Sequence, residues 1–157
     1  TVKRVASAED MRMINRQALR DLTPDEVYVF KVQACNDLVD RDFERFTKDS
    51  LAKLASLFVG KTIIVDHNWS AKNQRARIYQ TYIEKHEEGY TSLMAECYML
   101  RNDSTKDIID AIEGGILREV SVGFYNTVSK AVGLVFNNVV LNHRYSIETL
   151  ITTVMSQ

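Results

Sequence analysis

A predicted β-hairpin constrains the fold of this chain more than any other feature. Residues 75–85, RARIYQTYIEK, alternate polar and apolar side chains as a half-buried strand does. Residues 91–100, TSLMAECYML, form a second strand-like run, and EEGY between the two is typical of a hairpin turn. Two strands joined by so short a turn pair antiparallel. An antiparallel sheet is therefore the predicted centre of the fold.

Other segments with strand or helix periodicity lie on both sides of the hairpin. Further strands are predicted at 27–36, 61–67, 117–125 and 133–141, and helices at 8–20, 47–60 and 103–115. Residues 144–155 have a helical period but strand-like threonine and valine content, so both interpretations stay open. Strands and helices do not alternate regularly, which argues against a doubly wound sheet. We expect an α+β fold, with a mainly antiparallel sheet or small β-barrel of about six strands and about three peripheral helices.

The first predicted helix carries a start signal. Ser7 is followed three residues later by Asp10, the arrangement of a capping box ahead of an apolar-periodic run. Met11, Ile14 and Leu19 could share one face of a helix over 8–20. This helix is expected to dock at the edge of the domain.

Composition favours one domain over residues 1–157 and excludes several function classes. A formal net charge of −1 gives no support for binding nucleic acid or a membrane surface. No apolar stretch approaches the ~18–20 residues of a membrane span, and the N-terminal residues lack the apolar core of a secretory signal. Cys35 and Cys97 have no metal-ligand spacing and favour reduced thiols in a cytosol. No metal or organic cofactor is predicted.

Two residues stand where a rigid strand could present catalytic groups. Ser121 lies in REVSVGF, directly after a glycine pair, and His67 ends the apolar run KTIIVDH. A serine nucleophile needs a base within hydrogen-bonding reach, and the base needs a third group to orient it. The alternatives are a strand serine that only packs and a histidine that only bonds a loop. A metal site of Asp66, His67 and His86 has too few ligands in a recognisable motif.

The order of these motifs resembles the prohead (capsid maturation) proteases of tailed bacteriophages. These are serine proteases related in fold to the herpesvirus assemblins. The likeness rests on the acidic loop DLVDRDFERF, the DH at the end of a short strand, and EGGILREVSVGF downstream of it. It covers a recognisable core over 27–124, between an N-terminal helical segment (1–22) and a divergent C-terminal segment (125–157). The resemblance implies that Ser121 is the nucleophile and His67 the general base.

The third catalytic group is less well defined by the resemblance. Relatives in the phage branch suggest an acid on a strand between the histidine and the serine, and Glu96 in LMAECYML fits. Relatives in the herpesvirus branch use a second histidine after the serine, which makes His143 the second choice. Glu84 is a further acid in the right region, and Arg144 receives no role although it could donate to an oxyanion.

The resemblance also implies a function. The chain would be a serine endopeptidase acting in the procapsid interior, in the cytoplasm of a bacterial host. Its substrates would be scaffold segments, the major capsid protein and the protease itself. No cofactor, nucleic acid or membrane is implied, and a homo-oligomer is possible. Two alternatives stay open: a catalytically inactive capsid-assembly or scaffold-binding domain of the same fold, and a small β-barrel binding module.

Overall fold

A computed structural model of the chain describes residues 2–40, 43, 45–65, 70–122 and 151–155. The described helices are α1 (Ala8–Asn15), α2 (Lys48–Phe58) and α3 (Lys106–Glu113), with short 3-10 helices η1 (Pro24–Glu26) and η2 (Ala71–Asn73). The described strands are β1 (Val2–Arg4), β2 (Val27–Asn36), β3 (Thr62–Ile64), β4 (Gln74–Lys85), β5 (Thr91–Leu100), β6 (Glu119–Val122) and β7 (Ile151–Met155).

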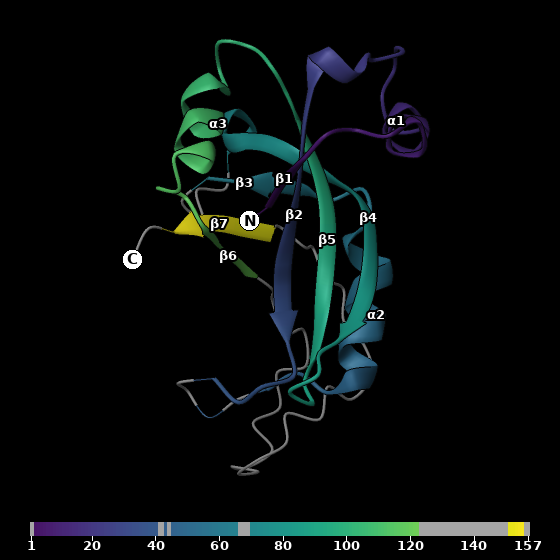
Figure 1. The fold of residues 1–157 in the computed structure, drawn as a ribbon, viewed down its shortest axis with the longest axis vertical. Helices are drawn as coiled ribbons and strands as arrows, with labels where there is room; N and C mark the ends of the chain where they lie inside the picture. Colours follow the sequence, from purple (N-terminus) through teal and green to yellow (C-terminus); the bar gives the residue numbers. More distant parts are fainter. Residues whose placement is uncertain (1, 41–42, 44, 66–69, 123–150, 156–157) are drawn as a thin grey trace.

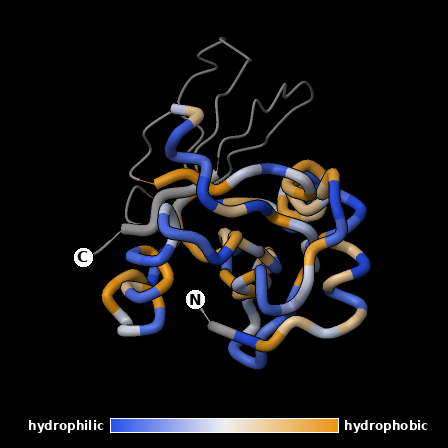
Figure 2. The backbone as a smooth tube through the Cα atoms, turned by 90° about the horizontal axis from the view of Figure 1, so that it is seen from above, coloured by the Kyte–Doolittle hydropathy of each residue, from blue (hydrophilic) through white to orange (hydrophobic). Residues whose placement is uncertain are grey.

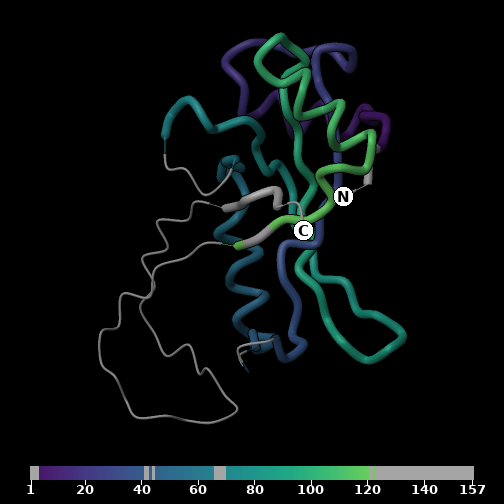
Figure 3. The backbone as a smooth tube through the Cα atoms, turned by 90° about the vertical axis from the view of Figure 1, so that its left-hand side faces the viewer, coloured from purple at the N-terminus to yellow at the C-terminus, as the bar shows by residue number. Residues whose placement is uncertain are grey.

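The main sheet contains five antiparallel strands in the order β1-β2-β5-β4-β3 (Figure 1). The predicted hairpin is confirmed as β4 and β5. Gly89 in its turn has a φ of 90°, a backbone conformation that glycine adopts without steric cost. The tip of the hairpin projects away from α2 (Figure 3). The predicted α+β fold on a mainly antiparallel sheet is therefore confirmed.

Two further strands form a small second sheet. β6 and β7 pair antiparallel, and their register shifts between Val120 and Val122. β6 contacts β2, and β7 contacts β3. Residues 144–155 were open to a helix or a strand, and 151–155 form the strand β7. The strand expected at 133–141 lies outside the described residues.

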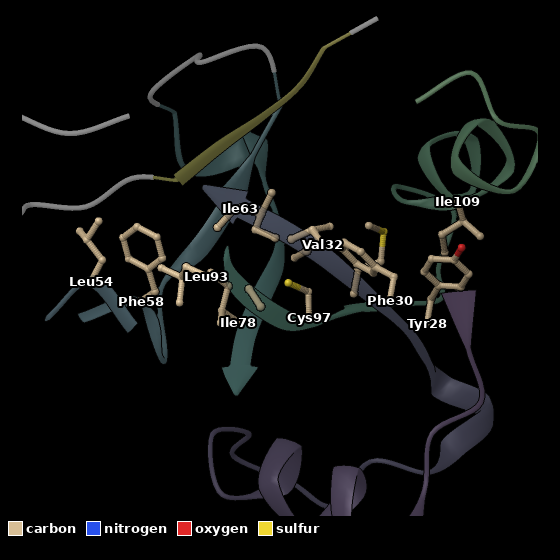
Figure 4. Packing of buried hydrophobic residues seen from close by; sticks show 14 of the residues in the cluster. Tyr28, Phe30, Val32, Leu54, Phe58, Ile63, Ile78, Leu93, Cys97 and Ile109 are labelled. Carbon is tan, nitrogen blue, oxygen red and sulfur yellow. The ribbon is translucent and has the colours of Figure 1, made fainter. Parts of the chain in front are cut away.

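One side of the main sheet, the α2 face, carries the larger apolar core. Leu51 and Phe58 of α2 are fully buried there, and Ile109 of α3 joins them at the other end of the core (Figure 4). Both helices contain hydrophobic and hydrophilic residues within each turn, as a helix with one buried side requires (Figure 2). Alternate residues of β2 and β5, including Phe30 and Cys97, point to this same core.

The opposite side, the α1 face, carries a smaller core beneath α1. Met11 and Ile14 of α1 pack in one cluster with Tyr79 of β4 and Tyr98 of β5. The centres of the two tyrosine rings lie 6.2 Å apart, a separation that suits an aromatic pair. The sheet is therefore covered on both faces, by α2 on one and by α1 on the other.

The first helix is shorter than predicted. Its capping box is confirmed, because Ser7 Oγ accepts from the Asp10 amide and the Asp10 carboxylate accepts from the Ser7 amide. The predicted end at residue 20 was wrong, since α1 ends at Asn15. The Asn15 side chain bonds both backbone groups of Leu22, at 2.9 and 3.2 Å, and so holds the chain in a turn. Leu19 consequently lies outside the helix and is fully exposed, not on its apolar face.

Three other elements are also shorter than the sequence patterns indicated. β3 spans only the three residues Thr62–Ile64, and its pairing with β4 shifts register between Ile63 and Ile64. α3 begins at Lys106, after a turn in which the hydroxyl of Thr105 bonds the carbonyl of Leu100. β6 spans 119–122 within the expected 117–125, whose last three residues lie outside the described chain.

Candidate active site

A hydrogen-bonded turn at the end of α3 leads into β6, the strand that carries Ser121. The amides of Ile116 and Leu117 both donate to the carbonyl of Ala111, at 2.8 and 3.1 Å, and wrap the chain around the helix end. Gly115 occupies this turn with a φ of 73°, a conformation that favours glycine. Gly115 therefore has a backbone role in the turn that joins α3 to β6.

β6 holds Ser121 between two packed neighbours. Val120 and Val122 contact the core of the α2 face. Ser121 itself lies at the register shift between β6 and β7, where Val120 pairs with Val154 and Val122 pairs with Ile151. Irregular pairing of this kind re-aims side chains and is frequent beside active sites. The backbone at Ser121 is thus anchored on both sides, within a locally irregular pair.

The strand that leads to His67 lies near the same small sheet. β3 ends at Ile64, and the amide of Val65 donates to the carbonyl of Asn73 at 3.3 Å. β7, the partner of β6, contacts β3. The structure thus brings together the strand of Ser121 and the strand that precedes His67, with β7 between them. His67 lies outside the described residues, as do Asp66, His143 and Arg144.

Glu96 is placed elsewhere. Its neighbours in β5, Ala95 and Cys97, face the core of the α2 face, so alternation directs Glu96 to the α1 face. There its carboxylate accepts from Arg4 Nε at 2.9 Å, and only 7% of the residue is exposed. Val120 and its strand pack on the α2 face, so the sheet separates Glu96 from β6. The role of Glu96 as third catalytic group is a prediction that these contacts do not support.

Arg4, Asp10, Tyr79 and Glu96 form a polar group that we name the Arg4 cluster. Arg4 Nη2 donates to Asp10 at 2.6 Å and to the Tyr79 hydroxyl at 2.8 Å, in addition to its bond with Glu96. Hydrogen bonding to Asp10, against the opposing effect of burial, raises the pKa of Arg4 further above its ordinary value. Burial alone would raise the pKa of Asp10, but hydrogen bonds from Arg4, Ser7 and Tyr79 outweigh it and hold that pKa well below its usual range.

The Arg4 cluster was missed by sequence reasoning. Asp10 was identified only as a helix-capping residue, and Arg4 received no role. The partners Arg4 and Glu96 are 92 residues apart, and no local pattern links them. The sole local signal was an acid, Glu96, inside an otherwise apolar strand, which requires a partner when it is buried.

The remaining candidates at the hairpin have structural contacts. The His86 ring stacks on Tyr90 with centroids 4.1 Å apart, and its Nε2 lies 2.9 Å from Ser92 Oγ. Glu84 pairs in register with Ser92, close to the same tip. Both residues lie at the end of β4 near the hairpin turn, whereas the backbone of Ser121 belongs to the small second sheet.

The described part of the chain has neither a cluster of metal ligands nor a helix that could cross a membrane. Residues 2–40, 43, 45–65, 70–122 and 151–155 contain no group of three or more His, Cys, Asp or Glu side chains that could hold a metal ion. Over the same ranges, no helix has the length and apolarity needed to cross a membrane.

The geometry defines the class of protein as an α+β domain on an antiparallel sheet, with a second two-stranded sheet that carries Ser121. Comparison with protein-family models, curated proteins and solved structures finds no significant match to this chain.

Proposed function

We propose that this chain is a serine endopeptidase of the prohead-protease type. The observation that carries the proposal is the anchoring of β6: Val120 and Val122 pack into the core on either side of Ser121, and β7 links this strand to β3, which leads to His67. A nucleophile on a rigid, packed strand meets the requirement that catalytic groups be held in place before substrate binds. The order of the motifs along the chain, described above, adds the reaction type.

The proposed fold extends the observed one to a closed barrel like that of the herpesvirus proteases. The strands follow one another as β2-β5-β4-β3 in the main sheet. β7 contacts β3, its partner β6 contacts β2, and the series thereby returns to its first strand. This circuit of contacts supports closure, because a barrel has no free edge between its first and last strands.

The proposed reaction proceeds through an acyl-enzyme. His67 takes the proton of the Ser121 hydroxyl, and the oxygen attacks the carbonyl carbon of the scissile peptide. The tetrahedral intermediate collapses as His67 passes the proton to the leaving amine, and the peptide C–N bond breaks. Water, activated by the same histidine, then hydrolyses the ester. Backbone N–H groups would stabilise the oxyanion, each contributing ~3 kcal/mol in typical enzymes.

The proposed third group changes with the position of Glu96. Because Glu96 is ion-paired with Arg4 on the α1 face, His143 becomes the first choice for the residue that orients His67. Parallel substitutions, Glu96→Gln and His143→Ala, separate the two. The His143→Ala variant is expected to lose most proteolysis with an unchanged melting temperature. The Glu96→Gln variant is expected to lose stability and to keep the turnover of its folded fraction.

The proposed substrates are scaffold segments, the major capsid protein and the protease itself, in the procapsid interior. The test compares wild type, Ser121→Ala and Ser56→Ala, each co-expressed with the capsid and scaffold proteins of the same phage. Ser56 is an exposed serine on α2, so its substitution is a matched control. Wild type and Ser56→Ala should process the substrates and cleave themselves, and Ser121→Ala should do neither.

Two results would contradict the proposal. Processing that persists in the Ser121→Ala variant excludes this serine as the nucleophile. Wild type that folds but cleaves neither the capsid protein, the scaffold nor itself supports the inactive assembly domain. Thermal unfolding of all three proteins, measured beforehand, shows whether a loss of processing reflects a loss of fold.

A further inference from the structure

The main sheet splits at one end. β4 and β5 pair up to Arg77 and Tyr98, and no further. Beyond this pair, Gln74 and Ala76 of β4 pair with β3, whereas Met99 and Leu100 of β5 pair with β2. A cavity of about 380 Å³ lies where the strands part, and the segment between α1 and η1 lines one side of it. We name this cavity the arginine fissure. Its volume is within the ~300–1,000 Å³ range of ligand pockets.

The arginine fissure is strongly basic. Arg20, Arg75 and Arg77 line it, and no acidic residue does. Arg20 is paired with Glu26 at 2.8 Å, and Arg77 donates to the neutral carbonyl of Gly60 at 3.2 Å. Arg75 is half-buried and has no partner among the described residues. With three arginines and one paired carboxylate, the local charge is about +2 in a chain whose net charge is −1. Such a concavity attracts anions.

Exposed apolar side chains at the arginine fissure narrow the choice of anion. Leu19, at the wall of the fissure, is fully exposed, and Leu100 is 39% exposed. A phosphate ion or a nucleic-acid backbone would leave these side chains in water.

We propose that the arginine fissure binds a peptide segment of a partner protein in which carboxylate side chains are interspersed with apolar ones. The carboxylates pair with Arg75 and Arg77, and guanidinium groups suit this pairing because their donors match both carboxylate oxygens. The apolar side chains cover Leu19 and Leu100. This binding is independent of the proposed proteolysis, since β6 packs on the α2 face and the fissure is lined by the α1–η1 segment.

The test uses a fluorescein-labelled heptapeptide, GELDELG, titrated against the Ser121→Ala variant so that cleavage cannot interfere. Fluorescence anisotropy gives the dissociation constant at 50 and 200 mM salt. Arg75→Gln is expected to weaken binding by about tenfold or more, as loss of a charge-assisted hydrogen bond does. Leu19→Ser is expected to weaken it roughly fivefold, and its side chain is too exposed to affect folding. Lys53→Gln on α2 removes an equal charge from an exposed site and should leave binding unchanged.

Two control peptides separate the contribution of the carboxylates to binding from that of the apolar side chains. The peptide GQLNQLG, without carboxylates, and GEGDEGG, without apolar side chains, should both bind more weakly than GELDELG. No binding of GELDELG up to 1 mM, or equal affinity in Arg75→Gln and Lys53→Gln, would overturn the proposal. Displacement of GELDELG by inorganic phosphate or by a single-stranded oligonucleotide at comparable concentration would also overturn it, in favour of a general anion site.

Discussion

Replacing Asp10 with Asn removes the central acid of the Arg4 cluster. The Asp10 carboxylate receives only donors: Arg4 Nη2 and the Tyr79 hydroxyl on one oxygen, and Arg4 Nη1, the Ser7 amide and the Ser7 hydroxyl on the other. An asparagine must place its NH₂ group against one of these sets, whichever way the amide turns. The substitution therefore introduces a donor-to-donor contact and also removes the charge that neutralises Arg4.

The expected loss of stability is about 3 kcal/mol. Breaking a buried ion pair by removing one partner costs ~3–5 kcal/mol. The lower end applies here because the Arg4 side chain is 33% exposed and keeps its second carboxylate, Glu96. For a chain of this length, each kcal/mol corresponds to roughly 2–4 °C in melting temperature, so the variant should melt about 6–12 °C lower.

Urea unfolding followed by far-UV circular dichroism measures the change. Asp25→Asn is the matched control, since Asp25 lies in η1 and is exposed. That control should stay within about 0.5 kcal/mol of wild type, as surface substitutions generally do. If Asp10→Asn is destabilised by less than about 1 kcal/mol relative to Asp25→Asn, the cluster does not hold β1 and α1 to the sheet in the way its geometry indicates.

The same residue predicts a pH dependence. Asp10 has a folded-state pKa held below its ordinary value by Arg4, Ser7 and Tyr79 against the effect of burial, whereas the unfolded chain has the ordinary pKa of ~3.9. Its stabilising contribution is thus complete above about pH 4 and is lost as the pH falls below that value. Wild type should lose stability in this acid range more steeply than Asp10→Asn. Parallel pH profiles of the two proteins would contradict the assignment.

Two further predictions concern the core and the thiols. Phe58→Ala should cost ~3–5 kcal/mol, because Phe58 is fully buried under α2, whereas Leu57→Ala at the adjacent, 38% exposed position should cost under ~1 kcal/mol in the same urea experiment. Burial raises the pKa of the Cys35 thiol to about 12 and that of Cys97 higher still, so both should react with an aromatic disulfide reagent at pH 8 on the order of 1,000-fold more slowly than in urea. Labelling of the native protein at the unfolded rate would refute the burial of both groups.

The elements predicted correctly are those whose signals are local. Two strand-like runs and a glycine-containing turn predict the hairpin of β4 and β5. Ser7 and Asp10 predict the cap of α1. The end of α1 was wrong because Asn15 is fixed by Leu22, seven residues further on and outside the helix. When a side chain fixes a helix end by bonding the next loop, the hydrophobic periodicity of the sequence does not show where the helix ends.

The arginine fissure could not be predicted from the sequence either. Arg20 follows α1, whereas Arg75 and Arg77 belong to β4, and only the parting of β4 from β5 brings the three side chains to one cavity. The net charge of −1 did not indicate this basic cavity, because a net charge averages the positive and negative side chains of the whole surface. The prediction that nucleic acid is not a partner rested on that average, and the oligonucleotide competition described above tests it directly.

Glu96 shows that an acid in an apolar strand indicates a partner but does not identify the kind of partner. An acid in an apolar strand signals a partner, because an unpaired carboxylate is too costly to bury. The signal is the same for a catalytic partner and for an ion pair, and strand alternation decides between them only once the face of the sheet is known. Here Ala95 and Cys97 occupy the α2 face with Val120 of β6, and Glu96 meets Arg4 on the other side. The ion pair with Arg4 holds β1 against the α1 face of the sheet, whereas the strand of Ser121 packs on the α2 face, so the sheet itself separates Glu96 from that strand.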